Sequence, residues 1–415
     1  MRYVVFLCLG RVVDWARCIV LIGVRKYIKL PVPISVDSEV LVAEKSLGWL
    51  SLAEGVVFDC DGVLVDSRES YGRAVVESVR FIFNRLGIRD YSPLVDQGQV
   101  DDLKATGHFN NSVDIARILL LLGFLGLPEK EERLLGEAIR AARSEGQDRE
   151  PSRILESVAS RVQLGGVEVR PPSVASVLSR MRVKEPGYVA FRRSLEETLR
   201  GLAIERGLGS DYSAYAEFIG ETGSYGVGLA ETVFSDIYYG PLVSEFKGSG
   251  PYFNLGGGLY TKETRSIREE TLRRLSEIYG AEKLAVVTGR NRRLAMLTIG
   301  GLYKHFNDRA SVFIADEIMG GAPPTIQKPS PYGIIKSASD MGVPTLIYVG
   351  DSAEDIAMAQ NASEFGIRTL FVGVTGLTHN PSRARNMFAS LGADVIVESV
   401  DSLPFIIEEA KKSAA

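Results

Sequence analysis

Short apolar runs alternate with helix-like segments in the C-terminal part of the chain. From Lys283 onward, the apolar runs are rich in β-branched residues, and the segments between them space apolar residues at helical intervals. The runs are Leu284 to Val287, Val312 to Ala315, Leu346 to Val349 and Thr369 to Val372, and the expected helices are Arg292 to Leu302, Pro331 to Met341 and Ala353 to Asn361. This alternation predicts a parallel sheet wrapped by helices.

A similar apolar run far upstream predicts the first strand of the same sheet. Gly55 to Phe58 leads directly into Asp59, which is followed by Asp61 and Gly62. In open α/β sheets the carboxyl end of a buried strand is where ligands bind. Residues two apart in an extended chain face the same side, so Asp59 and Asp61 can address one ligand. Because nearby carboxylates repel each other unless a cation or proton lies between them, the pair predicts a metal or acid–base site.

The segment between these two parts is predicted to be a mainly helical insertion. Arg68 to Leu86 spaces Tyr71, Val75, Val79 and Ile82 at helical intervals, and similar blocks recur up to Tyr279. We expect an N-terminal extension of unknown role at residues 1–50, an α/β core at 51–69 and 281–415, and the insertion at 70–280. An insertion that leaves from the catalytic edge of a sheet is well placed to act as a lid.

Composition and charge narrow the class of partner. The chain has 415 residues, of which 45% are hydrophobic, and a net charge of −4. Without a basic excess no nucleic-acid partner is expected. The apolar runs of the first 50 residues are shorter than the roughly 20 residues that cross a bilayer, so no membrane partner is expected either. They allow an extra strand or helix on the core, an interfacial anchor, or translated sequence before the true start. Three cysteines without disulfide or zinc spacing favour the cytoplasm.

Two further strand ends and the start of one predicted helix carry candidate chemistry. Thr288 and Gly289 follow one strand and could clamp an anion through a hydroxyl and backbone N–H groups, although Thr-Gly also caps helices. Lys328 precedes Pro329, which should direct the lysine toward the sheet edge. Asp351 ends another strand, and Asp355 lies four residues on, on the same helix face. Taken singly, these two acids could also be a helix cap and a solvated acid near a helix start.

In order and character, Asp59-x-Asp61, Thr288, Lys328 and Gly350-Asp351-x-x-x-Asp355 resemble the four motifs of the haloacid dehalogenase-like superfamily. The chain is similar to the phosphatase members with a large helical cap after the first motif, of the phosphoglycolate phosphatase-like kind. The resemblance implies a Rossmann-like α/β core, an inserted cap and Mg²⁺ as cofactor. It further implies a small phosphorylated metabolite as substrate, and hydrolysis through an aspartyl-phosphate.

The resemblance also assigns roles. Asp59 would be the nucleophile and Asp61 the general acid and base. The residues implied in metal binding are Asp59, Asp61, Asp351 and Asp355, with Asp61 acting through its carbonyl and Asp355 in the outer shell, and those implied in phosphate binding are Thr288, Gly289 and Lys328. Dehalogenases lack an acid at the position of Asp61, and phosphonatases have a small residue there, so phosphate esters are favoured.

Two other functions stay open on the sequence alone. A phosphomutase would use the same core and return the phosphoryl group to a sugar phosphate, and a non-catalytic module would only bind phosphorylated metabolites. Within the insertion, His108, Asn110 and Asn111 are candidates for substrate specificity. A hydrogen-bonded turn between two helices would explain the same residues.

Overall fold

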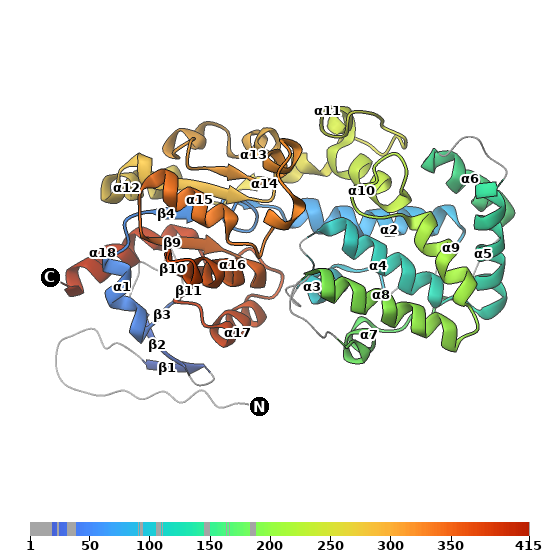
Figure 1. Ribbon diagram of the computed structural model, residues 1–415, viewed down its shortest axis with the longest axis horizontal. Coiled ribbons are helices and arrows are strands. Elements are labelled where there is room, and N and C mark those ends of the chain that lie inside the picture. The colour runs from blue at the N-terminus through green and yellow to red at the C-terminus, as the bar shows by residue number, and fades with distance from the viewer. Residues whose placement is uncertain are drawn as a thin grey trace. The chain divides into compact units, whose positions relative to one another are not determined.

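The computed structural model in Figure 1 describes residues 19–22, 25–30, 39–89, 91, 94–104, 109, 111–144, 150–162, 164–165, 167–182 and 188–414. The chain divides into two compact units. The first comprises residues 1–68 and 263–415, and the second comprises residues 69–262. Each unit is described by itself below.

A nine-stranded sheet forms the centre of the first unit, with the order β1-β2-β3-β11-β10-β9-β4-β7-β8. The six strands from β11 to β8 are parallel. They are β4 (Val56–Phe58), β7 (Leu284–Thr288), β8 (Val312–Phe313), β9 (Thr345–Gly350), β10 (Arg368–Val374) and β11 (Val395–Val397). Of these six strands, β4 comes first in the sequence and lies in the middle; β7 and β8 follow on one side of it, and β9, β10 and β11 on the other. This is the doubly wound order, and its direction reverses between β4 and β9. The predicted Rossmann-like core is therefore confirmed.

Three antiparallel strands from the N-terminal extension continue this sheet beyond β11 (Figure 1). They are β1 (Ile19–Ile22), β2 (Arg25–Leu30) and β3 (Val40–Ala43). Strand β3 pairs antiparallel with β11, and all four of its side chains are buried. Of the interpretations open for the extension, its described part corresponds to extra strands on the core.

Helices cover both faces of the sheet and bury one apolar cluster on each. Alternate residues of a strand enter different clusters: Val57 packs on one face, and Val56 and Phe58 on the other. Helices α1, α12, α13 and α18 contribute to one cluster, and α14 to α17 contribute to the other. Their bounds are α1 (Leu47–Ser51), α12 (Glu269–Tyr279), α13 (Arg292–Ile299), α14 (Ile314–Met319), α15 (Tyr332–Met341), α16 (Ala353–Glu364), α17 (Pro381–Leu391) and α18 (Leu403–Ala414).

Most element boundaries shift by one to three residues from the sequence expectation, and two differences change how a segment is assigned. Helix α12 was assigned to the insertion, but it belongs to the first unit because Leu272 and Leu275 are buried in the core of that unit. Strand β8 ends at Phe313, and Ile314 already begins α14, so the apolar run there is shared between a strand and a helix. A short apolar run does not by itself distinguish these two states.

The described residues of the second unit are mainly helical. Its helices are α2 (Arg73–Arg85), α3 (Gln97–Lys104), α4 (Ser112–Leu125), α5 (Glu129–Ser144), α6 (Pro151–Arg161), α7 (Val174–Arg180), α8 (Tyr188–Glu205), α9 (Gly209–Ile219), α10 (Leu229–Tyr239) and α11 (Val243–Lys247). Helix α4 is buried from Val113 to Leu125, as expected for a mainly apolar helix, and its two charged residues, Asp114 and Arg117, are hydrogen-bonded to Thr222 and to the Gly220 carbonyl. Among the described residues, no helix is both long and apolar enough to span a membrane.

A two-stranded ribbon lies where the chain leaves and re-enters the first unit. Strand β5 (Val65–Asp66) pairs antiparallel with β6 (Thr264–Arg265). The Ser266 backbone N–H also donates to the Leu64 carbonyl at 3.0 Å. The outgoing and returning segments of the chain are therefore hydrogen-bonded to each other within the first unit.

Candidate active site

Asp59 lies at the reversal point of the strand order. It follows β4, whose Phe58 is opposite Val286 of β7 and Val349 of β9. The Asp59 backbone N–H continues the ladder by donating to the Val349 carbonyl at 2.8 Å. Its side chain is buried. The register therefore brings the carboxyl ends of β4, β7 and β9 side by side, at the edge where doubly wound sheets bind ligands.

Lys328 joins Asp59 to Asp355. Its Nζ lies 2.8 Å from Oδ1 of Asp59 and 2.7 Å from Oδ1 of Asp355, and its side chain is only 5% exposed. Burial by itself lowers the pKa of Lys328, but the two carboxylates outweigh it and hold the pKa well above the ordinary value for lysine. The expectation that Lys328 faces the sheet edge is met by this geometry. The ammonium supplies the positive charge that clustered acids require.

The Asp355 carboxylate accepts five hydrogen bonds. Its Oδ2 accepts from the backbone N–H groups of Asp351 and Ser352 at 3.2 and 3.0 Å, and from the Ser352 hydroxyl at 2.6 Å. Its Oδ1 accepts from Lys328 and from the Tyr348 hydroxyl at 2.9 Å. Although burial opposes it, this set of donors lowers the pKa of Asp355. Asp355 therefore fixes the turn that carries Asp351.

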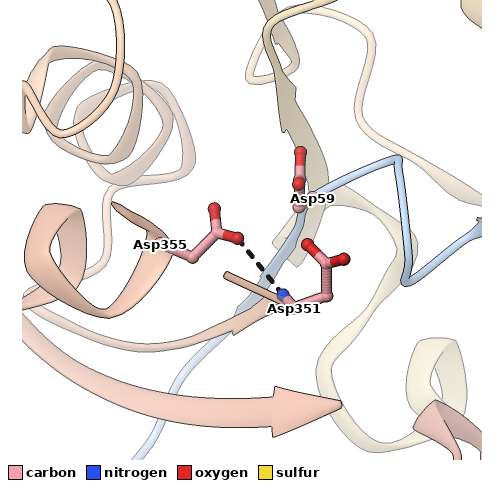
Figure 2. A group of neighbouring side chains, drawn as sticks. All are labelled: Asp59, Asp351 and Asp355. Atoms are coloured by element: carbon pink, nitrogen blue, oxygen red, sulfur yellow. Dashed lines mark hydrogen bonds between the residues drawn. The ribbon is translucent and has the colours of Figure 1, made fainter. Parts of the chain in front are cut away.

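Asp59, Asp351 and Asp355 form a group that could hold a cation. Figure 2 shows their side chains together, with the Asp351 N–H bond to Asp355 dashed. Each offers an oxygen, and these atoms lie within 4.8 Å of one another. Burial, followed by the nearby Asp355 and Asp61 charges, raises the pKa of Asp59 to about 7 against the opposing effect of Lys328. A bound divalent cation would restore the ionised form, and carboxylate oxygens are the ligands that Mg²⁺ prefers, so the residues fit this metal.

Gly62 allows Asp351 to approach the first strand. Its φ is +67°, in the left-handed region, and a Cβ built on it would lie 2.0 Å from Oδ2 of Asp351. Both the backbone conformation and the contact require glycine at this position. The glycine that ends the Asp59-x-Asp61 segment therefore makes room for the second carboxylate of the site.

Thr288 and Gly289 lie at the end of β7. Thr288 is buried, and its Oγ1 accepts from the Arg290 backbone N–H at 3.2 Å. A Cβ built on Gly289 would meet nothing within 4 Å, so the backbone there borders open space. This edge of the turn can admit a ligand close to the backbone.

Asp61 does not join the carboxylate group but binds Arg290. Arg290 Nε donates to Oδ2 of Asp61 at 2.8 Å, and its second terminal nitrogen bonds Oδ1. The same guanidinium binds Glu263. Sequence reasoning assigned no role to Arg290 or Glu263. Arg290 could have been noticed because it directly follows Thr288-Gly289, whereas Glu263 stands in no recognisable motif.

The cap candidates are only partly described. His108 and Asn110 lie outside the described residues. Asn111 is the N-cap of α4, and its Oδ1 accepts from the Val113 backbone N–H at 2.9 Å. This contact is the hydrogen-bonded turn that the sequence also allowed.

Comparison with known proteins agrees with this geometry. The family model described as haloacid dehalogenase-like hydrolase matches residues 256–363, which include Thr288, Lys328, Asp351 and Asp355. Residues 256–363 thus match a haloacid dehalogenase-like hydrolase domain. The first motif, with Asp59 and Asp61, lies outside the matched residues. The pairing of β4 with β7 and β9 places this motif beside the residues that the haloacid dehalogenase-like model matches.

Two solved structures resemble the chain. One is a crystal structure of a Northeast Structural Genomics Consortium target, with 17% identity and a TM-score of 0.54 over 86% of this chain and 98% of the other. The second is a phosphatase from Thermococcus thioreducens, with 19% identity and a TM-score of 0.41 over 81% of this chain and 99% of its own. At this identity the first likeness concerns the fold. No curated protein sequence matches the chain.

Proposed function

We propose that the protein is a Mg²⁺-dependent phosphomonoester hydrolase that acts on a small phosphorylated metabolite through an aspartyl-phosphate. The observation that carries this proposal is the placement of Lys328 between Asp59 and Asp355. A buried carboxylate beside a fixed cation, at the carboxyl edge of a parallel sheet, suits a nucleophile that attacks an anionic phosphoryl group.

In the first step, an Asp59 oxygen forms a bond to phosphorus while the ester P–O bond breaks. Asp61 gives a proton to the departing oxygen, since an alkoxide is a poor leaving group. Lys328, the Thr288 hydroxyl and the Gly289 N–H group bind the phosphate oxygens, whose charge is redistributed as the ester bond breaks.

In the second step, water attacks the aspartyl-phosphate. Asp61 accepts a proton from the water as the new P–O bond forms, and the bond between phosphorus and Asp59 breaks. Inorganic phosphate leaves, and Asp59 and Asp61 return to their starting states. The Asp59 and Asp351 carboxylates and the Asp61 carbonyl would hold Mg²⁺, with Asp355 supporting the turn behind them. When bound, the metal supplies positive charge that screens the phosphate from the attacking carboxylate.

The direct test is a panel of phosphorylated metabolites assayed for release of inorganic phosphate, with Mg²⁺ and with a chelator. We expect Mg²⁺-dependent release from at least one ester and none in chelator. Conversion to an isomer without phosphate release would identify a phosphomutase instead. Tight binding of an ester without any turnover would identify a binding module, and both results would overturn the proposal.

Substitution of Gly62 by alanine tests the carboxylate arrangement. Gly62→Ala must adopt a left-handed backbone, at a cost of about 1–2 kcal/mol, and must also displace the Asp351 carboxylate. We expect weaker Mg²⁺ binding and about a hundredfold lower turnover, because small displacements at a reacting centre are costly.

Gly342→Ala is the matched control for this substitution. Gly342 has a φ of +65°, but a Cβ there meets nothing within 4 Å, so the variant has the backbone strain alone. For both variants, Mg²⁺ affinity would be measured by calorimetric titration and turnover by phosphate release. Thermal unfolding would check that the two variants are equally stable. Equal metal affinity in both would show that the contact with Asp351 does not matter.

A further inference from the structure

Arg290 connects two carboxylates that lie far apart in sequence. Its Nε lies 2.8 Å from Oδ2 of Asp61, and its terminal nitrogens lie 2.7 and 2.9 Å from Oε2 and Oε1 of Glu263. The guanidinium thus makes a two-point contact with each partner. A planar guanidinium bound in this way fixes the orientation of both carboxylates, which a lysine ammonium would not do.

Glu263 anchors this arrangement. The side chains of Arg290 and Glu263 are 1% and 0% exposed, whereas that of Asp61 is 30% exposed. Glu263 Oε2 also accepts from the Thr298 hydroxyl at 3.0 Å, which ties it to α13. Because one partner is buried and fixed, the guanidinium has a defined position, and the accessible carboxyl group at the other end is Asp61.

We propose that Arg290, anchored by Glu263, is a positioning residue that fixes the Asp61 carboxyl group for proton transfer to the leaving-group oxygen. This inference rests on the proposed phosphatase function and adds two residues to its machinery. Arg290 contacts Asp61 and has no role in bond making at phosphorus.

The charge balance of the trio is compatible with this role. Glu263 supplies the Arg290 guanidinium with a buried counter-ion that takes no part in the proposed proton transfer. In the first step that proton moves to the leaving oxygen as its bond to phosphorus breaks and the Asp59 oxygen bonds to phosphorus. In the second step a water proton returns to Asp61, and the water oxygen replaces the Asp59 oxygen on phosphorus.

The dependence of rate on the leaving group distinguishes positioning of the acid from a general structural role. The p-nitrophenolate group departs with little help from an acid, whereas phenolate needs more. We expect Arg290→Lys to lower kcat/KM for phenyl phosphate about tenfold more than for p-nitrophenyl phosphate. Breakdown of the aspartyl-phosphate is common to both esters, so where it limits turnover, kcat should fall by the same factor for both.

A control comes from another arginine–aspartate pair in the first unit, whose arginine is more exposed than Arg290. Arg268 Nε donates to Oδ2 of the buried Asp401 at 2.7 Å, and Asp401 plays no part in the proposed chemistry. Arg268→Lys should lower kcat/KM for both esters equally, if at all. Should Arg290→Lys fail to fold, the double substitution Arg290→Met with Glu263→Gln removes the buried charges together and can be tested in the same way.

The outcomes separate this inference from the proposed function. Hydrolysis of both esters by the wild-type protein, and of neither by Asp59→Asn, would support the function on its own. A uniform loss for the two esters in the Arg290 variants, or no loss, would then overturn the positioning role while leaving the phosphatase in place. A wild-type protein that released no phosphate from these two esters or from any ester of the metabolite panel would overturn both.

Discussion

Replacement of Asp59 by asparagine is expected to reduce the turnover of phosphate esters by about 10⁴-fold or more. The amide has no negative oxygen with which to form the bond to phosphorus, so the two-step route is closed. The fold should be retained, because asparagine has the same shape and the backbone bond to Val349 does not involve the side chain. Lys328 still has the Asp355 carboxylate as its counter-ion in this variant, so no buried charge is left unpaired.

The measurement is phosphate release together with acid-quenched labelling of the protein by a radioactive ester. The wild-type protein should retain label as an acyl phosphate, and Asp59→Asn should retain none. Asp59→Ala guards against slow deamidation of the asparagine back to aspartate. Asp340→Asn, in a partly exposed ion pair with Arg309, serves as a matched control that should keep full activity. Substantial Mg²⁺-dependent release by both Asp59 variants would show that another residue attacks phosphorus.

Replacement of Lys328 by methionine is expected to affect both stability and turnover. The substitution leaves two buried carboxylates without their shared cation, which should lower the free energy of unfolding by about 3–5 kcal/mol. It also removes a fixed positive charge beside the reacting phosphate, at a cost of about 10²–10³-fold in kcat. Denaturant unfolding in chelator and phosphate release in Mg²⁺ measure the two effects separately.

The loss of stability in Lys328→Met should depend on pH. Without the ammonium, the pKa values of Asp59 and Asp355 both rise, whereas an unfolded aspartate titrates near about 3.9. A carboxyl group with a raised pKa binds a proton more readily in the folded state, so its contribution to stability falls as the pH rises above the unfolded value. The deficit relative to wild type should therefore be larger at about pH 8 than at about pH 5.

A surface lysine provides the control. Lys412→Met removes a side chain that is 73% exposed and 3.9 Å from Glu409, and it should change neither stability nor its pH dependence. If Lys328→Met were as stable as this control at both pH values, the bridge between Asp59 and Asp355 would not hold the site together.

The parts of the site that follow from local sequence were predicted. Asp59, Thr288 and Asp351 each end a short apolar run, and the carboxyl ends of parallel strands meet at one edge. Lys328 was placed there because the proline after it favours an extended backbone at that point. In these cases the strand period and the turn residue together locate the side chain, without knowledge of the rest of the fold.

Arg290 and Glu263 were not predicted because their roles depend on a contact between distant segments. Asp61 and Arg290 are 229 positions apart in the sequence, and Glu263 joins them only through the tertiary fold. An arginine after a Thr-Gly turn and a glutamate before a two-residue strand have no pattern that links them. The end of β8 was missed for a different reason, since Ile314 continues an apolar run that suits either a strand or a helix.

The ribbon of β5 and β6 has a consequence for the evolution of the chain. Val65 is paired with Arg265 and Asp66 with Thr264, so a tight turn could join the two strands directly. The intervening 197 residues, from 67 to 263, occupy the position of a hairpin loop. Such a segment can be lengthened, exchanged or lost between descendants without shifting the register of any strand in the parent sheet. Glu263 is the last residue of this segment, so exchange of the segment would also replace the residue that anchors Arg290.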